Sequence, residues 1–262
     1  MTESSIRFED GAAYERMMGT WSGIAGRIFV DWLKPPRGLR WIDVGCGNGA
    51  FSEVLVEHCA PAAVQGVDPS GAQIDFARKR PAARLAKFEI GNAMALPFPN
   101  AAFDAATMAL VIFFVPDPKK GVAEMARVVR PGGMVAAYAW DILGGGHPQE
   151  PIRAELRTMG IEPADPPSVE ASRIETMRDL WRGAGLQAVE AREITVQRTF
   201  ADFEEFWEIS RLGSSLLPTF AAMSADDIQR FKARVRARTA ADGAGRITSS
   251  GRVNAVKGRV PE

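Results

Sequence analysis

The spacing of apolar residues predicts alternating helices and strands over the first half of the chain. Residues 14–33 carry apolar side chains at helical spacing, and Pro35 and Pro36 would end that helix. Short apolar runs follow, separated by segments of helical character. These runs lie at 39–44, 63–67, 86–91, 102–112 and 134–140. Strands alternating with helices favour an α/β fold with a doubly wound, mostly parallel sheet.

The second half of the chain has a looser pattern. Residues 187–199 alternate like an exposed strand, and residues 246–258 resemble a last strand. Between them, residues 200–244 have helical character and carry aromatic side chains, among them Phe203 and Trp207. The pattern therefore predicts seven strands, with a helical insertion between the last two.

Composition and charge narrow the functional classes. The chain has 262 residues, of which 46% are hydrophobic and 24% charged, and its formal net charge is zero. Nucleic-acid binding usually needs a clearly basic face, so we expect no nucleic-acid partner. Basic residues do gather at 230–259, where a solvated helix face and an edge strand are favoured over a phosphate-binding surface.

Cysteine usage and the apolar runs bear on metal binding and location. Cys46 and Cys59 form no CxxC or Cys/His cluster, so we expect no metal site and a reducing, cytoplasmic setting. The N-terminal residues do not resemble a signal peptide. The longest apolar run, 105–115, is too short to span a membrane.

A glycine turn after the first strand carries the strongest chemical signal. Gly45, Gly47 and Gly49 stand two positions apart, between an apolar run and a helical segment. Glycines allow positive φ angles and a close approach of ligand to backbone, and amides at a helix start favour anionic or polar groups. The segment therefore predicts binding of a nucleotide-like cofactor.

Two cofactor classes fit such a turn. A dinucleotide fingerprint can be placed on Gly45, Gly47 and Ala50, with Asp68 as the distal acid. However, Asp43 lies two residues before the first glycine, where a carboxylate would disfavour a pyrophosphate. A cofactor with an ammonium and a sulfonium group would suit it better.

Several ordered motifs extend this argument beyond the turn. They are WIDVGCGNG (41–49), GVDPS (66–70), GNAMALPFPNAAFD (91–104), LVIFFVPDP (110–118) and EMARVVRPGGMV (124–135). With them the chain resembles the class I S-adenosylmethionine-dependent methyltransferases, of the small-molecule branch that includes ubiquinone and menaquinone methyltransferases. The resemblance implies a Rossmann-like sheet with an antiparallel last strand in one domain (1–262), an N-terminal helix at 14–33 and a helical cap at 200–244. It also implies methyl transfer from S-adenosylmethionine to a small-molecule acceptor, with S-adenosylhomocysteine as product.

The resemblance assigns cofactor contacts residue by residue. Asp43 would neutralise the amino end, and Asp68 would accept hydrogen bonds from the ribose hydroxyls; alternatively, each only caps a neighbouring backbone segment. Tyr14 and Trp21 are candidates for aromatic contact with the sulfonium, or else core residues. The remaining contacts would come from Gly45, Cys46, Gly47, Pro69, Gln73, Asn92, Ala93, Met94 and Ala109.

The chain also departs from the family pattern. Asn92 stands where an Asp is common, and Phe113 and Phe114 stand where many relatives carry a His pair. The phenylalanines remove the obvious general base and suggest an apolar acceptor site. His147 and Asp141 are weak base candidates for which a structural role is favoured, so we expect catalysis by proximity.

The acceptor side remains open at the level of sequence. Trp207 is expected to contribute to an apolar lid over the acceptor, unless the helices of 200–244 complete the core or form a dimer contact. The chain is expected to be a monomer or homodimer. Two other functions remain as alternatives: an S-adenosylmethionine-binding protein without methylating activity, and an NAD(P)-dependent oxidoreductase.

Overall fold

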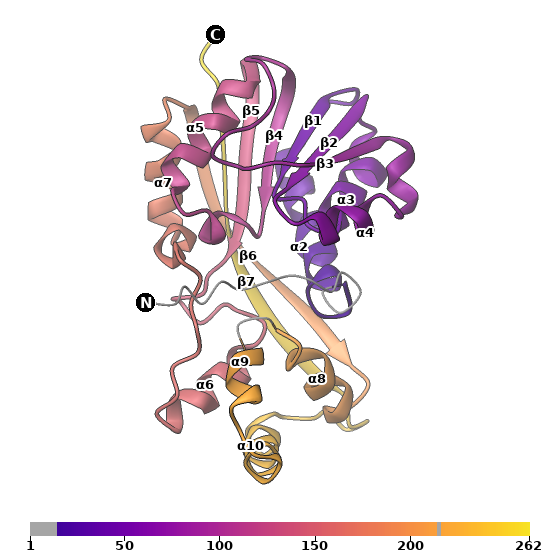
Figure 1. The fold of residues 1–262 in the computed structure, drawn as a ribbon, viewed down its shortest axis with the longest axis vertical. Helices are drawn as coiled ribbons and strands as arrows, with labels where there is room; N and C mark the ends of the chain where they lie inside the picture. The colour runs from indigo at the N-terminus through magenta and orange to yellow at the C-terminus, as the bar shows by residue number, and fades with distance from the viewer. Residues whose placement is uncertain (1–14, 214–215) are drawn as a thin grey trace.

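A seven-stranded sheet forms the centre of the molecule. The computed structural model describes residues 15–213 and 216–262, and Figure 1 shows their arrangement. The strand order is β3-β2-β1-β4-β5-β7-β6, and β7 runs antiparallel to both of its neighbours. The strands are β1 (Arg40–Val44), β2 (Ala63–Asp68), β3 (Ala86–Ile90), β4 (Phe103–Ala109), β5 (Val129–Trp140), β6 (Gln187–Phe200) and β7 (Ile247–Arg259). The predicted sheet and its antiparallel last strand are confirmed.

Helices cover both faces of this sheet. On one face lie α2 (Thr20–Leu33), α3 (Ala50–Cys59) and α4 (Gly71–Ala77), and on the other lie α5 (Pro118–Val128) and α7 (Ile174–Gly183). Helix α2 buries Trp21, Ala25 and Phe29 along one stripe, as the sequence spacing predicts. A π-helical turn, η1 (Glu15–Gly19), precedes α2, and Tyr14 lies outside the described residues.

Strand β5 begins earlier than the pattern indicates. Pro131–Gly133 has the composition of a turn, and the apolar run predicts a strand from 134, but the strand starts at Val129. Pairing with the chain end explains the difference: the Gly132 amide donates to the Val260 carbonyl, and the Val260 amide donates to the Gly133 carbonyl. Gly132 takes a φ of 71° there, a conformation that favours glycine.

The insertion between β6 and β7 forms a separate group of helices below the sheet (Figure 1). These cap helices are α8 (Phe203–Ser210), α9 (Leu217–Ala221) and α10 (Ala225–Arg238), and α10 packs against α6 (Glu150–Thr158). The paired ends of β6 and β7 carry them, because Phe200 pairs with Ile247. The cap helices therefore lie beyond the carboxyl ends of the parallel strands, the edge where such folds bind ligands.

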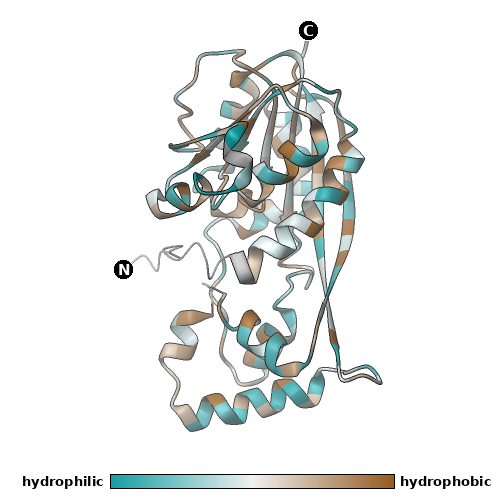
Figure 2. Ribbon diagram, turned by 90° about the vertical axis from the view of Figure 1, so that its right-hand side faces the viewer, coloured by the Kyte–Doolittle hydropathy of each residue, from teal (hydrophilic) through white to brown (hydrophobic). Residues whose placement is uncertain are grey.

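The basic residues of α10 are mostly engaged with acids. Arg230 pairs with Asp227 at 2.5 Å, while Lys232 and Arg236 both pair with Glu204. Figure 2 shows α10 as a largely hydrophilic helix on the outside of the cap. This agrees with the interpretation of a solvated helix face.

Within residues 15–213 and 216–262, no helix has the length and apolar character needed to cross a membrane.

Candidate functional site

The three glycines of the turn differ in what surrounds them. A Cβ on Gly45 would lie 2.5 Å from Cγ1 of Val111, so this glycine permits close packing of the loop after β4. A Cβ on Gly49 would lie 3.1 Å from Cβ of Ala77. A Cβ on Gly47 would meet nothing within 4 Å, although its φ is 51°. Of the three glycines, Gly47 is therefore the one whose Cβ side is open among the described residues.

Asp68 joins the end of β2 to the glycine turn. Its Oδ2 accepts a hydrogen bond from the Gly47 amide at 2.9 Å, and its Oδ1 accepts one from the Ser70 amide at 2.9 Å. Ser70, rather than Asp68, caps α4 by accepting from the Gln73 amide, so the alternative of Asp68 as helix cap is wrong. Burial raises the pKa of Asp68, and its two amide hydrogen bonds oppose that rise.

Asp43 is a fully buried carboxylate at the end of β1. Its Oδ2 accepts a 2.6 Å hydrogen bond from the hydroxyl of Ser52 on α3, whereas no described residue donates to Oδ1. Burial raises its pKa to about 7, helped by the charge of Asp68 and opposed by the Ser52 hydrogen bond. Asp43 therefore bonds to a helix rather than to the turn amides, and it keeps one acceptor oxygen for a further donor.

Arg80, which no sequence motif marked, supports the glycine turn through hydrogen bonds. The Nε of Arg80 donates to the Asn48 carbonyl at 2.6 Å, and its Nη1 donates to Glu53 at 2.7 Å. Its side chain is one-tenth exposed. No local motif marks Arg80, because its partners lie 27 and 32 positions away.

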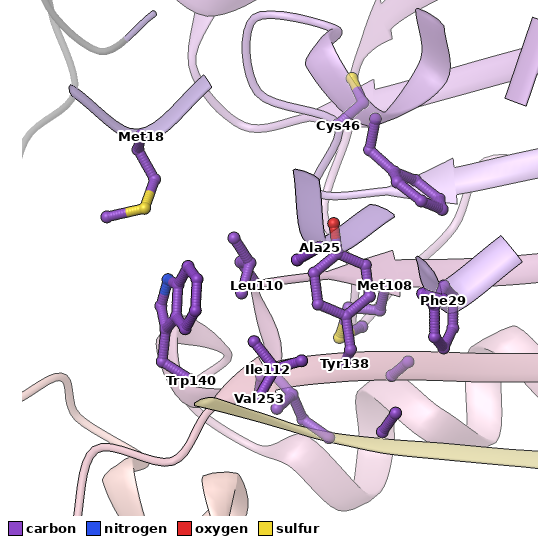
Figure 3. Close-up of a cluster of buried hydrophobic side chains, with 14 of the residues drawn as sticks. Met18, Ala25, Phe29, Cys46, Met108, Leu110, Ile112, Tyr138, Trp140 and Val253 are labelled. Carbon is purple, nitrogen blue, oxygen red and sulfur yellow. The ribbon is translucent and has the colours of Figure 1, made fainter. Parts of the chain in front are cut away.

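The end of β4 brings a strained backbone to the same edge. Ala109 is the half-buried last residue of the strand, and Leu110 follows with a φ of 61°, unusual for a residue other than glycine. The Leu110 amide donates to the Tyr138 carbonyl at 2.8 Å. Figure 3 shows Leu110 among buried side chains from neighbouring elements. Such strain is often found at functional sites, and the sequence carries no signal for it.

The loop predicted to contact adenine follows β3. The Oδ1 of Asn92 accepts from the Met94 amide at 2.8 Å. Ala93 and Met94 are half-buried, while Asn92 is exposed. On the β2 side, Gln73 is buried and Pro69 is exposed. Cys46 is buried as well, and burial raises its thiol pKa far above the usual range, as befits a small filler.

Trp21 lies in the core between α2 and β5. It is 4% exposed and makes an edge-on contact with Trp140, with ring centroids 6.1 Å apart. Figure 3 shows Trp140 at the end of β5, where the sheet meets α2. This geometry agrees with the interpretation of Trp21 as the residue that docks the N-terminal helix.

The two weak base candidates are both engaged in structure. Asp141 forms an ion pair with Arg252 at 2.5 Å and accepts from the Gly144 amide. The Nδ1 of His147 accepts from the Gln149 amide at 3.1 Å, and burial, together with the charge of Arg153, lowers the His147 pKa to about 3. His147 is therefore neutral at physiological pH, and the favoured structural role fits both residues.

The expected acceptor residues are packed more deeply than the pattern suggests. Phe113 is 3% exposed and Phe114 is half-buried, with their rings 4.7 Å apart. Trp207 is 2% exposed and packs on Phe203, Phe220 and Phe231. Trp207 thus forms the core of the cap helices, the alternative that the sequence left open.

In residues 15–213 and 216–262, no group of His, Cys, Asp or Glu side chains could hold a metal ion.

Comparison with known proteins finds methyltransferases similar to part of this chain. Residues 42–137 match the family described as a methyltransferase domain. A demethylmenaquinone methyltransferase of Deinococcus radiodurans is 38% identical over 36% of this chain and 40% of its own. The O-methyltransferase cnsE of Penicillium expansum is 31% identical over 62% of this chain and 57% of its own. The chain spans about half the length of the curated relatives it matches.

The fold has solved counterparts. Phosphoethanolamine N-methyltransferase 2 of Haemonchus contortus, solved in complex with S-adenosyl-L-methionine, matches with a TM-score of 0.57 at 16% identity. The match covers 96% of this chain and 57% of that chain. At this identity the likeness establishes the fold alone.

Proposed function

We propose that this chain, which carries a class I S-adenosylmethionine-dependent methyltransferase domain, transfers the methyl group of S-adenosylmethionine to a small-molecule acceptor. The relatives' names support this proposal, because one is a demethylmenaquinone methyltransferase and the other an O-methyltransferase. We further propose that the sheet and the cap helices act as one domain, because they share strands β6 and β7.

One observation carries the proposal: two carboxylates flank an open glycine turn. Asp68 is the last residue of β2, Asp43 is the last but one of the adjacent parallel strand β1, and the Gly47 amide donates to Asp68. Asp43 is buried with an Oδ1 that accepts no hydrogen bond from the described residues. A ligand with positive groups relieves such an arrangement, whereas a dinucleotide pyrophosphate would be repelled by it. These two acceptor groups therefore fit S-adenosylmethionine better than NAD(P).

Each of these residues has a role that follows from its chemistry. Asp68 would accept hydrogen bonds from the ribose hydroxyls with its remaining lone pairs, since each oxygen already holds one amide. Asp43 would face the amino end, directly or through water. Gly47 lets the backbone approach the methionine portion. When bound, S-adenosylmethionine supplies an electrophilic methyl group, so the protein mainly has to position the acceptor.

Orientation and exclusion of water then account for the catalysis. Asp141 is ion-paired and His147 is neutral, so neither is poised as a strong base. Holding two reactants in line can contribute on the order of 7–11 kcal/mol in favourable cases. The cap helices beyond the strand ends would exclude water from that space.

Calorimetric titration tests the cofactor first. We expect S-adenosylmethionine and S-adenosylhomocysteine to bind, and NADH not to bind. Asp68→Ala should weaken both by at least tenfold, because charged hydrogen bonds are lost. Asp75→Ala is the matched control, since Asp75 lies exposed on α4 and pairs with Arg78. Tight NADH binding, or equal effects of the two variants, would contradict the proposal. Transfer of labelled methyl to candidate acceptors then tests the activity.

A further inference from the structure

Three nearly consecutive elements bring hydrogen-bond donors together below the sheet. Trp140 is the last residue of β5, His147 lies in the loop that follows, and Arg153 lies on α6. The loop stays close to the sheet, because the Asp141 amide donates to the Arg252 carbonyl of β7 and the Arg252 amide to the Gly146 carbonyl. These residues stand at the carboxyl ends of the strands, between the sheet and the cap helices.

Trp140 contributes a buried donor without an acceptor. Its side chain is 1% exposed, and no described residue accepts from its Nε1–H. Figure 3 shows the indole nitrogen on the side of the ring away from Leu110 and Tyr138. A buried donor without an acceptor destabilises the folded protein by about 1–3 kcal/mol, so an acceptor from a ligand would be favourable at this indole N–H.

His147 contributes a second donor beside it. The two rings are in edge-on contact, with centroids 6.2 Å apart. Because Nδ1 accepts from the Gln149 amide, the neutral ring carries its proton on Nε2. Within the described part of the chain, no acceptor pairs with that Nε2–H.

Arg153 adds a buried positive charge. Its side chain is 4% exposed, and it pairs with Asp165 through Nη2 at 2.5 Å, while no described residue accepts from its Nε. The Arg153 amide donates to the carbonyl of Gln149, the residue whose own amide bonds to His147, and the charge of Arg153 helps to lower the pKa of His147. Asp165 itself is 42% exposed, so solvent weakens its hold on the guanidinium. The neighbouring carboxylates are taken by other cations: Asp141 by Arg252, and Glu155 by Arg234.

The position of this cluster suits an acceptor rather than the cofactor. The segment that bears Asp165 is tied to the 3-10 turn that follows β4 (Ile112–Phe114), because the Ser168 amide donates to the Phe113 carbonyl at 3.0 Å. The cluster thus stands at the same edge as the glycine turn but on the side of β4 and β5. Donors with no matching acceptor select a ligand that presents only acceptor oxygens, and a buried guanidinium selects an anionic one.

We propose that Trp140 Nε1–H, His147 Nε2–H and Arg153 form a carboxylate site, so that the methyl acceptor is a carboxylic acid. This inference rests on the proposed methyltransferase function, which it deepens by assigning the acceptor's chemical class. Asp165 already pairs with Arg153, so an acceptor carboxylate would either displace Asp165 or share the guanidinium with it.

Benzoate is the probe, added to protein saturated with S-adenosylhomocysteine. The readout is the indole ¹⁵N–¹H signal of Trp140, identified as the signal lost in Trp140→Phe. We expect benzoate to shift this signal and benzyl alcohol to bind at least tenfold more weakly, because it lacks the charge. Arg153→Gln should weaken benzoate binding at least tenfold. Arg157→Gln is the matched control: Arg157 lies one turn further along α6 and pairs with Glu150, so benzoate binding should not change.

Asp165→Asn gives a test in the opposite direction. Because it removes the competing carboxylate and leaves Arg153 in place, it should tighten benzoate binding severalfold, which a merely structural role of Arg153 would not produce. It also keeps the inference testable if Arg153→Gln does not fold. Equal binding of benzoate and benzyl alcohol, or weaker benzoate binding in Asp165→Asn, would overturn the carboxylate site.

The same samples separate the two proposals. Calorimetry with S-adenosylhomocysteine alone reports on the cofactor site. Cofactor binding without benzoate binding would overturn the carboxylate site and leave the proposed function standing. Failure of the cofactor to bind would contradict the proposed function, and benzoate titrated without cofactor would still decide the carboxylate site.

Discussion

Asp43 should couple cofactor binding to the release of a proton. Its carboxyl is fully buried and has a pKa of about 7 against an ordinary value of 3.8. A cationic amino end placed near the open Oδ1 favours the ionised form and lowers this pKa. At pH 6.5 about three quarters of the free protein holds the proton, so binding should release about 0.7–0.8 proton.

The same carboxyl makes stability depend on pH in a defined direction. The folded chain holds the Asp43 proton up to about pH 7, whereas the unfolded chain loses it near pH 3.8. The folded state therefore binds more protons in this window, and stability falls as the pH rises through it. The full cost above pH 7 is roughly 4 kcal/mol, and Asp43→Asn should abolish it.

Calorimetry in buffers of different ionisation enthalpy measures the released protons directly. S-adenosylhomocysteine is titrated at pH 6.5, where a free α-amino group is almost fully protonated and contributes little. Methylthioadenosine, which lacks the amino acid portion, is the matched ligand, and Asp43→Asn the matched variant. Methylthioadenosine binding to the wild type, and S-adenosylhomocysteine binding to Asp43→Asn, should each release close to no proton. Equal proton release by the two ligands, or by wild type and Asp43→Asn, would refute the assignment of Asp43 to the amino end.

Three further predictions concern packing and protonation. Gly47→Ala should lower S-adenosylhomocysteine affinity at least tenfold while costing only about 1 kcal/mol of stability, whereas Gly45→Ala should destabilise more because of its 2.5 Å approach to Val111; calorimetry and urea unfolding separate the two. Trp207→Ala should cost about 3–5 kcal/mol in urea unfolding, and a change in acceptor KM without loss of stability would instead restore the lid interpretation. As the pH falls from 6.5 to 3, the wild type should lose stability, because the folded state keeps the His147 ring neutral while the unfolded chain protonates it. His147→Asn should make this loss smaller, and unchanged acid unfolding would contradict that account.

Much of the fold follows from local pattern. Strand β2, which begins at Ala63, and helix α2 lie close to the ranges that the apolar spacing predicts, because each element shows one face to a core. The start of β5 could not be predicted from local pattern. Pro131–Gly133 has the composition of a turn, but hydrogen bonds with Val260 hold this segment in the strand. Local propensity cannot report a partner more than a hundred residues away.

The candidate site divides in the same way. The glycines and Asp68 are visible in sequence because they cluster near strand ends, where the fold gathers its ligand contacts. The support of the turn by Arg80 and the backbone strain at Leu110 depend on packing between elements, and no local spacing encodes them. Trp207 shows the limit most clearly, because an aromatic stripe on a helix looks alike whether it covers a substrate or fills a small core.

The placement of the cap helices links the two halves of the proposed reaction. They are carried on the paired ends of β6 and β7, and Gln149 anchors them by donating from its side chain to the Ser210 carbonyl of α8. Gln149 follows His147 by two residues and donates its own amide to that ring. A movement of the cap would therefore be felt at the donors proposed to hold the acceptor, whereas Asp43 and Asp68 stand on rigid parallel strands. Acceptor choice can then vary through the cap and the β5–α6 loop while the cofactor contacts stay fixed.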